Sequence, residues 1–351
     1  MRIGLPREVK DGEYRVALTP AGVASLSRNN IEVVFEPGAG AGSGFSDQSF
    51  LQAKATLGDP WECELVVKVK ELQESEYRKP RRGQTIFGFQ HFGPAPELLD
   101  AALASGATYI AFETVGQDGG RLPILSPMSA IAGRLSVQAG AWCLQKQNGG
   151  SGVLLAGLDG VPPGKVVILG AGNVGSNALF VATGMNAQVV VFAKSQSRFG
   201  ELNARFPQAE FRTEGLERKV RDADLVIGGV LTPGQMSPKL ISRALLRSMR
   251  RGSALVDVGI DQGGIAETSR PTSHSEPTYV EEGVVHYCVP NMPSACARTA
   301  SLALERAVLP FIKDILHNAF SPELQTGLQV RAGKVVHPQL ARDTKRAYSP
   351  A

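Results

Sequence analysis

Cysteines are scarce in this sequence and long apolar runs are missing, and both shortages exclude classes of protein. The 351 residues include four cysteines, Cys63, Cys143, Cys288 and Cys296, with no CxxC spacing and too few to staple so long a chain. We therefore expect reduced thiols and no metal. No window approaches the roughly 20 apolar residues that span a bilayer, and the first residues, MRIGLPREVK, lack the apolar core of a signal peptide. We expect a soluble, cytoplasmic protein with no membrane partner.

A strong excess of charge of one sign is also missing. The net charge is +4, and charged residues of both signs are mixed along the chain, so neither disorder nor a basic arm for nucleic acid is indicated. The densest basic run, residues 78–82, is interrupted by Pro80 and followed by Gly83, which favours a solvated loop over a phosphate-binding patch. We expect no nucleic-acid partner.

The order of apolar segments predicts two α/β domains, as the chain length also favours. Short apolar runs alternate with helical ones in the N-terminal third, where Thr19 before Pro20 is a good helix start. The strand–helix rhythm begins again at Lys165 and turns helical after Pro293. We assign residues 1–128 plus 299–351 to a substrate domain and 129–298 to a dinucleotide-binding domain.

A glycine motif follows the strand expected at residues 165–169. Gly170, Gly172 and Gly175 form GxGxxG before a helix. The first glycine allows a tight turn, the second admits a pyrophosphate to the backbone, and the third lets helix and strand pack closely. The helix start offers free N–H groups to phosphate oxygens. We therefore predict two Rossmann-like, doubly wound parallel-sheet domains with a cleft between them.

An acidic residue is missing where NAD sites usually carry one. About twenty residues after such a motif an Asp or Glu normally accepts hydrogen bonds from the ribose hydroxyls, but the strand VVVF is followed by Ala193, Lys194, Ser195 and later Arg198. A small neutral residue followed by donors and positive charge suits a 2′-phosphate. This favours NADP(H) over NAD(H). NAD(H) stays possible if Lys194 and Arg198 are merely solvated loop charges.

Polar residues at expected strand ends are candidates for chemistry, because ligands of open α/β sheets bind there. They are Lys70, His91, Asp261 and Asn291. Each alone is ambiguous, since Asp261 could cap a turn and His91 could be structural. Arg15, just before a helix start, could bind a carboxylate through two parallel hydrogen bonds or form a surface salt bridge.

Four segments give the chain a resemblance to a known family. EYRVALTPAGV, LVVKVKE, VDVGIDQGGIAETSRPTSHSEPTY and VVHYCVPNMPSACARTAS resemble the alanine dehydrogenase and pyridine nucleotide transhydrogenase family, and its soluble alanine dehydrogenases in particular, from Met1 to about Leu309. The resemblance implies interconversion of L-alanine with pyruvate and ammonia, two domains that close over the substrate, and a homo-oligomer, either a hexamer or a dimer.

The resemblance also implies roles for individual residues. Arg15 and Lys70 would hold the substrate carboxylate and carbonyl, His91 would be the acid/base, and Asp261 would assist the proton and ammonia steps. Asn291 would lie at the nicotinamide. The cofactor-binding residues would be Gly170, Gly172, Asn173, Val174, Gly175, Ala193, Lys194, Ser195, Arg198, Ser129, Leu231 and Asn291.

Departures from the family pattern lie near these residues. Ala130 replaces a glutamate, Phe92, Gly93 and Pro94 follow His91 in place of the usual residues, and Ala193 replaces the ribose-binding aspartate. Phe92 and Ala130 would lie at the wall of the substrate pocket. We expect reductive amination of a 2-oxo acid, or reduction of a related imine, with NADP(H). The alternatives are a true L-alanine dehydrogenase, a transhydrogenase subunit and a non-catalytic NADPH-binding protein.

Overall fold

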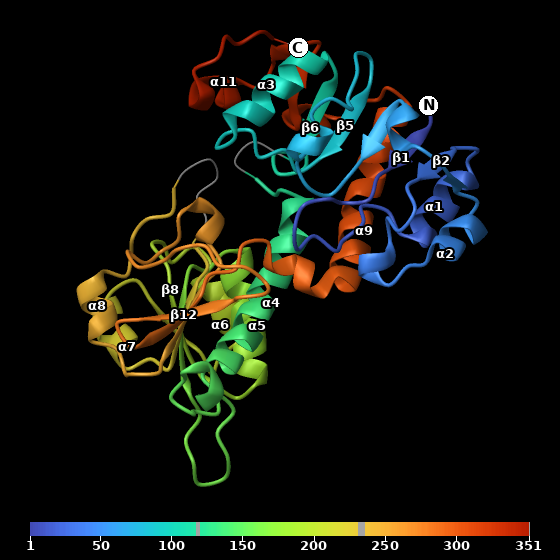
Figure 1. Ribbon diagram of the computed structural model, residues 1–351. Coiled ribbons are helices and arrows are strands. Elements are labelled where there is room, and N and C mark those ends of the chain that lie inside the picture. The colour runs from blue at the N-terminus through green and yellow to red at the C-terminus, as the bar shows by residue number, and fades with distance from the viewer. Residues whose placement is uncertain (117–119, 231–235, 351) are drawn as a thin grey trace. The chain divides into compact units, whose positions relative to one another are not determined.

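The computed structural model describes residues 1–116, 120–230 and 236–350, which form two compact units (Figure 1). The first unit contains Met1–Met128 and Ser294–Ala351, and the second contains Ser129–Pro293. The chain passes from the first unit to the second within the helix α4 (Leu125–Cys143). It returns just before α9 (Ala297–Leu316).

The first unit is built on an eight-stranded sheet with the order β15-β14-β6-β5-β4-β1-β2-β3. Strands β1 to β6 pair in parallel, and β14 joins β6 antiparallel. Runs such as VVF and LVV are buried throughout, as expected for a parallel sheet covered on both faces. The strands are β1 (Ile3–Leu5), β2 (Val33–Phe35), β3 (Thr56–Leu57), β4 (Leu65–Val67), β5 (Thr85–Gly88), β6 (Thr108–Ala111), β14 (Leu328–Arg331) and β15 (Lys334–Val335).

The helices of this unit begin at capping residues that the sequence provides. The predicted helix start at Thr19 is confirmed: its hydroxyl accepts from the N–H of Ala21 at 3.3 Å, and Pro20 occupies the first turn. In Figure 1, α1 and α2 lie beside β2, and α3 and α11 lie near β6. The helices, in addition to α9, are α1 (Pro20–Ser27), α2 (Asp47–Gln52), α3 (Pro96–Ser105), α10 (Pro322–Thr326) and α11 (Pro338–Thr344).

The second unit contains a seven-stranded sheet with the order β12-β13-β11-β10-β7-β8-β9. Apart from β12, its strands pair in parallel and outward in both directions from β7, which is the doubly wound order of dinucleotide-binding domains. The predicted fold class, two parallel-sheet α/β domains, is confirmed. The strands are β7 (Lys165–Leu169), β8 (Gln188–Phe192), β9 (Glu210–Arg212), β10 (Leu225–Gly228), β11 (Ala254–Asp257), β12 (Thr278–Glu281) and β13 (Val284–Tyr287).

Short helices accompany this sheet, and α5 is the longest after α4. They are α5 (Asn173–Gly184), α6 (Phe199–Arg205), α7 (Leu216–Arg221) and α8 (Arg243–Arg247). A core of buried aliphatic side chains lies between α4, α5 and the sheet; it includes Val137, Leu179, Val166, Ile168 and Ile227. Within the described ranges, none of the helices has the length and apolar character needed to cross a bilayer.

Candidate active site and cofactor site

The turn between β7 and α5 has the geometry that its glycines predict. Gly170 has φ 105, and a Cβ there would lie 2.7 Å from the carbonyl oxygen of Gly229. A Cβ on Gly175 would lie 1.8 Å from the carbonyl oxygen of Gly170, so α5 packs directly on the turn. Two of the three motif glycines are therefore required by the protein's own packing.

Gly172 has a different task, because a Cβ there would meet nothing within 4 Å among the described residues. It is the N-cap of α5, and its carbonyl accepts from the N–H of Ser176 at 2.9 Å. Open space therefore faces the first helical residues, Asn173 and Val174, whose N–H groups lack intrahelical acceptors. These features fit the pyrophosphate of a dinucleotide.

Helix α4 closes one side of this helix start. A Cβ on Gly133 would lie 2.2 Å from the carbonyl oxygen of Val174, so α4 and α5 are in backbone contact. Arg134 also donates from Nε to Asn177 Oδ1 at 3.0 Å. Ser129 lies one turn earlier on α4 and is half-buried.

The segment after β8 carries the residues expected at a 2′-phosphate. Arg198 donates from Nη1 to the carbonyl oxygen of Ala171 at 2.9 Å, which fixes its guanidinium on the glycine turn. Lys194 and Ser195 are exposed, and the N–H of Ala193 donates to Arg212 at 3.1 Å. The structure thus brings Arg198 and the glycine motif together from 27 residues apart.

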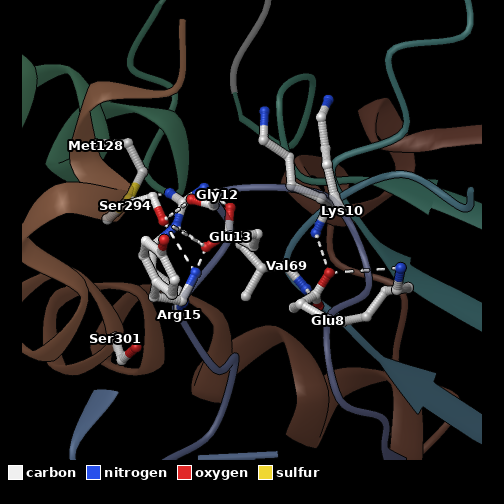
Figure 2. A network of polar contacts seen from close by, with 12 residues as sticks. Glu8, Lys10, Gly12, Glu13, Arg15, Val69, Met128, Ser294 and Ser301 are labelled. Carbon is white, nitrogen blue, oxygen red and sulfur yellow. Dashed lines mark hydrogen bonds and ion pairs between the residues drawn. The ribbon is translucent and has the colours of Figure 1, made fainter. Parts of the chain in front are cut away.

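Arg15 is buried in the first unit and is held by a neighbour in the sequence. Its Nε and Nη2 donate to the two oxygens of Glu13 at 2.7 and 2.6 Å, and its Nη1 lies 3.2 Å from Met128 Sδ. The guanidinium is 2% exposed, so this is a buried bidentate pair, not the surface salt bridge that the sequence left open. Figure 2 shows the pair beside Met128 and Ser294.

Helix α9 and the turn before it hold the backbone that carries Arg15. The N–H of Tyr14 donates to Ser294 Oγ at 2.9 Å, the N–H of Val16 donates to Ser301 Oγ at 2.9 Å, and the N–H of Thr19 donates to Glu305. Burial raises the pKa of Glu305, although its contacts with Thr19 and Gly22 oppose the shift. Residues nearly 300 positions later therefore position Arg15.

Lys70 lies just past β4 and is 8% exposed. Its Nζ lies 5.9 Å from the centroid of the Phe89 ring, and its backbone N–H donates to Glu8 at 3.3 Å. Glu8 also accepts from the N–H of Val69 at 2.5 Å (Figure 2). Burial raises the pKa of Glu8 to about 7, against the opposing charge of Lys68. Glu8 thus fixes the strand end that presents Lys70.

Lys68 carries a second buried charge beneath the same strand end. It is 1% exposed, and its Nζ lies 2.9 Å from Glu76 and 3.4 Å from Glu8. Burial lowers the pKa of Lys68, but the two carboxylates outweigh that effect and raise it. A permanent ammonium charge is therefore fixed two residues before Lys70.

His91 follows β5 in the left-handed conformation, with φ 46. Its N–H donates to Glu113 at 2.8 Å, and its ring stacks on Phe89 with 5.7 Å between centroids. Nδ1 lies 4.0 Å from Glu113, and Nε2 lies 4.0 Å from Glu71. With the ring 41% exposed, His91 is placed between two carboxylates and is accessible to a small molecule.

Asp261 and Asn291 belong to the second unit. Asp261 is exposed on the 3-10 helix Ile260–Gln262, and Asn291 has φ 57 after β13. The buried carboxylate that ends β11 is Asp257, which the sequence analysis missed. It accepts from the N–H groups of Gly259 and Ile265 at 3.2 and 2.7 Å, so it braces the loop that carries Asp261. The sequence feature that could have identified Asp257 is its position as an acid at the end of a buried strand.

Two residues expected at the site, Phe92 and Leu231, are not found there among the described residues. Phe92 was expected to shape a substrate pocket, but its side chain is 3% exposed and packs edge-on against Tyr109 in the core. That interpretation is wrong, because the chain turns at His91 and directs Phe92 inward. Leu231, expected at the cofactor, lies outside the described residues.

The fold and the glycine turn define a class of two-domain dinucleotide-binding oxidoreductases, and comparison with known proteins identifies the family. Residues 4–132 match the alanine dehydrogenase/PNT N-terminal domain, and residues 136–338 match the corresponding C-terminal domain. The chain belongs to this family. It is a NAD(P)-dependent amino acid dehydrogenase, and it uses a nicotinamide cofactor.

Individual relatives are similar over their whole length. An alanine dehydrogenase of Halomonas elongata is 46% identical over 97% of this chain and 96% of its own, and one of Mycolicibacterium smegmatis is 44% identical over 100% and 99%. A solved L-alanine dehydrogenase superposes with a TM-score of 0.95 at 44% identity, covering 98% of this chain and 99% of its own. A transhydrogenase from Sinorhizobium meliloti, at 24% identity and a TM-score of 0.83 over 96% of this chain and 99% of its own, shares the fold.

Proposed function

We propose that the protein catalyses the NADP(H)-preferring reductive amination of a small 2-oxo acid, and the reverse oxidation of the amino acid. The observation that carries the proposal is the cluster at the ends of β4 and β5. There Lys70 and His91 both lie against the Phe89 ring, with the Lys70 Nζ 5.9 Å from its centroid and the His91 ring stacked 5.7 Å away. An ammonium and an accessible imidazole so placed suit a carbonyl that must be polarised and protonated.

Substrate binding is assigned to Arg15 and Lys70. Two cations match the carboxylate and the polarised carbonyl of a 2-oxo acid, and a fixed guanidinium orients the acid before reaction. Glu13 fixes the plane of Arg15, and Glu8 fixes the strand end at Lys70. The site is preorganised by carboxylates that do not themselves meet the substrate.

Proton transfer is assigned to His91, with assistance from Asp261. The imidazole would give and take protons while ammonia adds to the carbonyl and water leaves. Asn291 would lie at the nicotinamide. A nicotinamide cofactor, when bound, supplies or accepts the hydride. We assign its binding to Ser129, the glycine motif, Asn173, Val174, Ala193, Lys194, Ser195 and Arg198.

The NADP(H) preference is supported by the segment after β8. No carboxylate stands at position 193, Lys194 and Ser195 are exposed, and Arg198 is fixed on the turn by its contact with Ala171. A 2′-phosphate would gain charge-assisted hydrogen bonds here that a ribose hydroxyl would not. NAD(H) remains the second candidate, because Arg198 also meets Glu201 at 3.4 Å and is partly neutralised.

A true L-alanine dehydrogenase is the second candidate for the substrate. The relatives named alanine dehydrogenase favour it, and so does the burial of Phe92, which removes one argument against pyruvate. The exchange of the family's glutamate for Ala130 still favours another 2-oxo acid or nitrogen partner. Lys70 and His91 argue against both a non-catalytic NADPH-binding protein and a transhydrogenase subunit.

The surroundings of the enzyme also belong to the proposal. We place it in the cytoplasm, as expected from the sequence. We also propose that it is a homo-oligomer, a dimer or a hexamer, because members of its family assemble in this way. Light scattering of the purified protein will give its mass. A monomer at micromolar concentration would contradict this assignment.

A substrate panel tests the proposed function. Pyruvate and larger 2-oxo acids are combined with ammonia or a primary amine, each with NADPH and with NADH, and oxidation of the cofactor is followed by absorbance. We expect turnover of at least one 2-oxo acid, and faster turnover with NADPH. Binding of NADPH without turnover of any combination would support the non-catalytic alternative. A pyruvate amination rate above ~10⁴ M⁻¹s⁻¹ in kcat/KM would establish the alanine dehydrogenase.

A further inference from the structure

Glu71, the residue after Lys70, lies in an unusual environment for a carboxylate. Its side chain is 13% exposed, and one oxygen, Oε1, pairs with Lys10. The other oxygen, Oε2, is buried and has no hydrogen-bond partner among the residues that the structure describes. Because a buried acceptor without a partner is unfavourable, this oxygen requires an explanation.

The group that faces this oxygen is the imidazole of His91. Glu71 Oε2 lies 4.0 Å from Nε2 of His91, and Glu113 Oε1 lies 4.0 Å from Nδ1. The two carboxylates differ in what else they hold. Glu113 already accepts from the N–H of His91 at 2.8 Å and from that of Gln90 at 3.2 Å. Glu113 thus holds the backbone of His91, whereas Glu71 Oε2 lies beside its ring.

We propose that Glu71 is a positioning residue that orients the His91 imidazole through Nε2. The assignment rests on the proposed function, in which His91 is the acid/base. A carboxylate 4.0 Å from Nε2 favours the ring orientation in which Nε2 faces it, so that proton exchange with the reacting molecule falls to Nδ1, where Glu113 lies at the same distance.

The surrounding charges support this role. Burial opposes ionisation of Glu71, but Lys70, His91 and Lys10 together lower its pKa below the usual value, so it is a carboxylate at neutral pH. Among the residues that the structure describes, the acids Glu71 and Glu113 each lie 4.0 Å from the His91 ring. The cations Lys70 and Lys10 act on Glu71 in turn. Removing Glu71 takes away a negative charge, whereas removing Lys10 takes away a positive one. The two changes should therefore move the proton-binding constant of His91 in opposite directions.

The test measures the proton affinity of His91 by NMR, which does not require turnover. The five histidines are labelled at Cε1, and His91→Asn assigns the signal of interest. We expect Glu71→Gln to lower the proton-binding constant of His91 by about tenfold, because a negative neighbour is lost. Glu71→Asp should restore most of it. The control is Glu74→Gln, an exposed acid three residues later, which should leave it unchanged.

A second variant covers the case in which Glu71→Gln does not fold. Lys10→Gln removes the cation that holds the other oxygen of Glu71, and we expect it to raise the proton-binding constant of His91 by about threefold. A constant that changes by less than about 1.5-fold in the folded Glu71→Gln protein, or in Lys10→Gln where the first does not fold, overturns the role of Glu71. If the constant shifts as expected while the wild-type protein aminates no 2-oxo acid, the proposed function fails and the coupling stands.

Discussion

Each unit has its own sheet, and the two units use the carboxyl-terminal ends of their strands in different ways. At the strand ends of the first unit, the protein holds charge inside itself. The ion pairs whose partners are both below 5% exposed, Arg15–Glu13, Lys68–Glu8 and Lys68–Glu76, all belong to this unit, among the residues that the structure describes. At the end of β7 in the second unit lies a turn of glycines, and no described residue comes within 4 Å of a Cβ placed on Gly172.

The difference reflects what each edge would bind. A small 2-oxo acid offers one carboxylate and one carbonyl, so its recognition needs cations whose positions are fixed beforehand, and the buried carboxylates fix them. A pyrophosphate is large and carries several acceptors, so backbone N–H groups and a helix start suffice, provided that no side chain stands in the way. Substitutions at the strand ends of the first unit should therefore lower turnover, whereas those at the glycine turn of the second should weaken cofactor binding.

The largest expected effect is on turnover in the first unit. His91→Asn or Lys70→Ala should lower kcat/KM by about 100-fold or more, because each removes a group that acts on the reacting carbonyl. The control is Lys79→Ala, which removes a lysine whose contact is the Trp61 ring and should leave the rate unchanged. Steady-state kinetics with the best 2-oxo acid measure this. Rates within about threefold of the wild type in both variants would show that the chemistry lies elsewhere.

The next effect separates the glycines of the second unit. Gly175→Ala places a Cβ 1.8 Å from the carbonyl oxygen of Gly170, so we expect it to destabilise the protein by about 1–3 kcal/mol and to abolish measurable cofactor binding. Gly172→Ala meets no atom of the described residues within 4 Å, so it should weaken NADPH binding by at least about tenfold at an unchanged melting temperature. Calorimetry and thermal melts distinguish the two. Gly184→Ala, at the end of α5, is the control, because a Cβ there also meets nothing within 4 Å in the described part of the chain.

Equal losses of stability in Gly172→Ala and Gly175→Ala would contradict the different roles assigned to the two glycines. Gly172 would then be needed for folding and not for binding a ligand.

The buried charge of the first unit should appear in the pH dependence of stability. Because burial raises the pKa of Glu8 to about 7 from 4.5, the folded state holds this proton more tightly than the unfolded state. Its contribution is therefore fully present below pH 4.5 and lost as the pH rises through 7, by up to about 3 kcal/mol. Glu8→Gln should flatten the decline in denaturant midpoint between pH 5 and 8. An unchanged slope would show that folding does not raise the pKa of Glu8.

The smallest effect concerns cofactor choice. We expect NADPH to bind at least about tenfold more tightly than NADH, and Ala193→Asp with Lys194→Ile to reverse the preference. Arg198→Ala should weaken NADPH more than NADH, whereas Arg205→Ala, whose guanidinium lies over Phe206, should change neither. Titration calorimetry with both cofactors measures this, and tighter binding of NADH by the wild type would reverse the assignment.

The sequence-based predictions that are confirmed rest on local patterns. Buried apolar strands, the capping of α1 by Thr19 and the packing of the glycine turn all depend on residues a few positions apart. The carboxylates around the candidate site could not be found in this way. Glu8 meets Lys70 from 62 positions away, and Glu113 meets His91 from 22. Such pairings are products of the sheet order, which the sequence does not display.

The wrong interpretation of Phe92 has a local cause. A strand that continued past β5 would alternate its side chains, but the left-handed φ 46 of His91 interrupts the alternation. A non-glycine residue in this conformation is unusual, and its identity as histidine gives little indication of it. The backbone hydrogen bond to Glu113 at 2.8 Å stabilises it, and that partner lies on the segment after β6.

The most direct test of this division between the units is the NADPH dissociation constant of the double variant Lys70→Ala, His91→Asn. If the first unit acts on the substrate alone, the double variant should be inactive and should bind NADPH within about twofold of the wild type. Titration calorimetry of both proteins in one buffer gives the comparison. NADPH binding weakened by about tenfold or more, in a protein that melts at the wild-type temperature, would contradict the account.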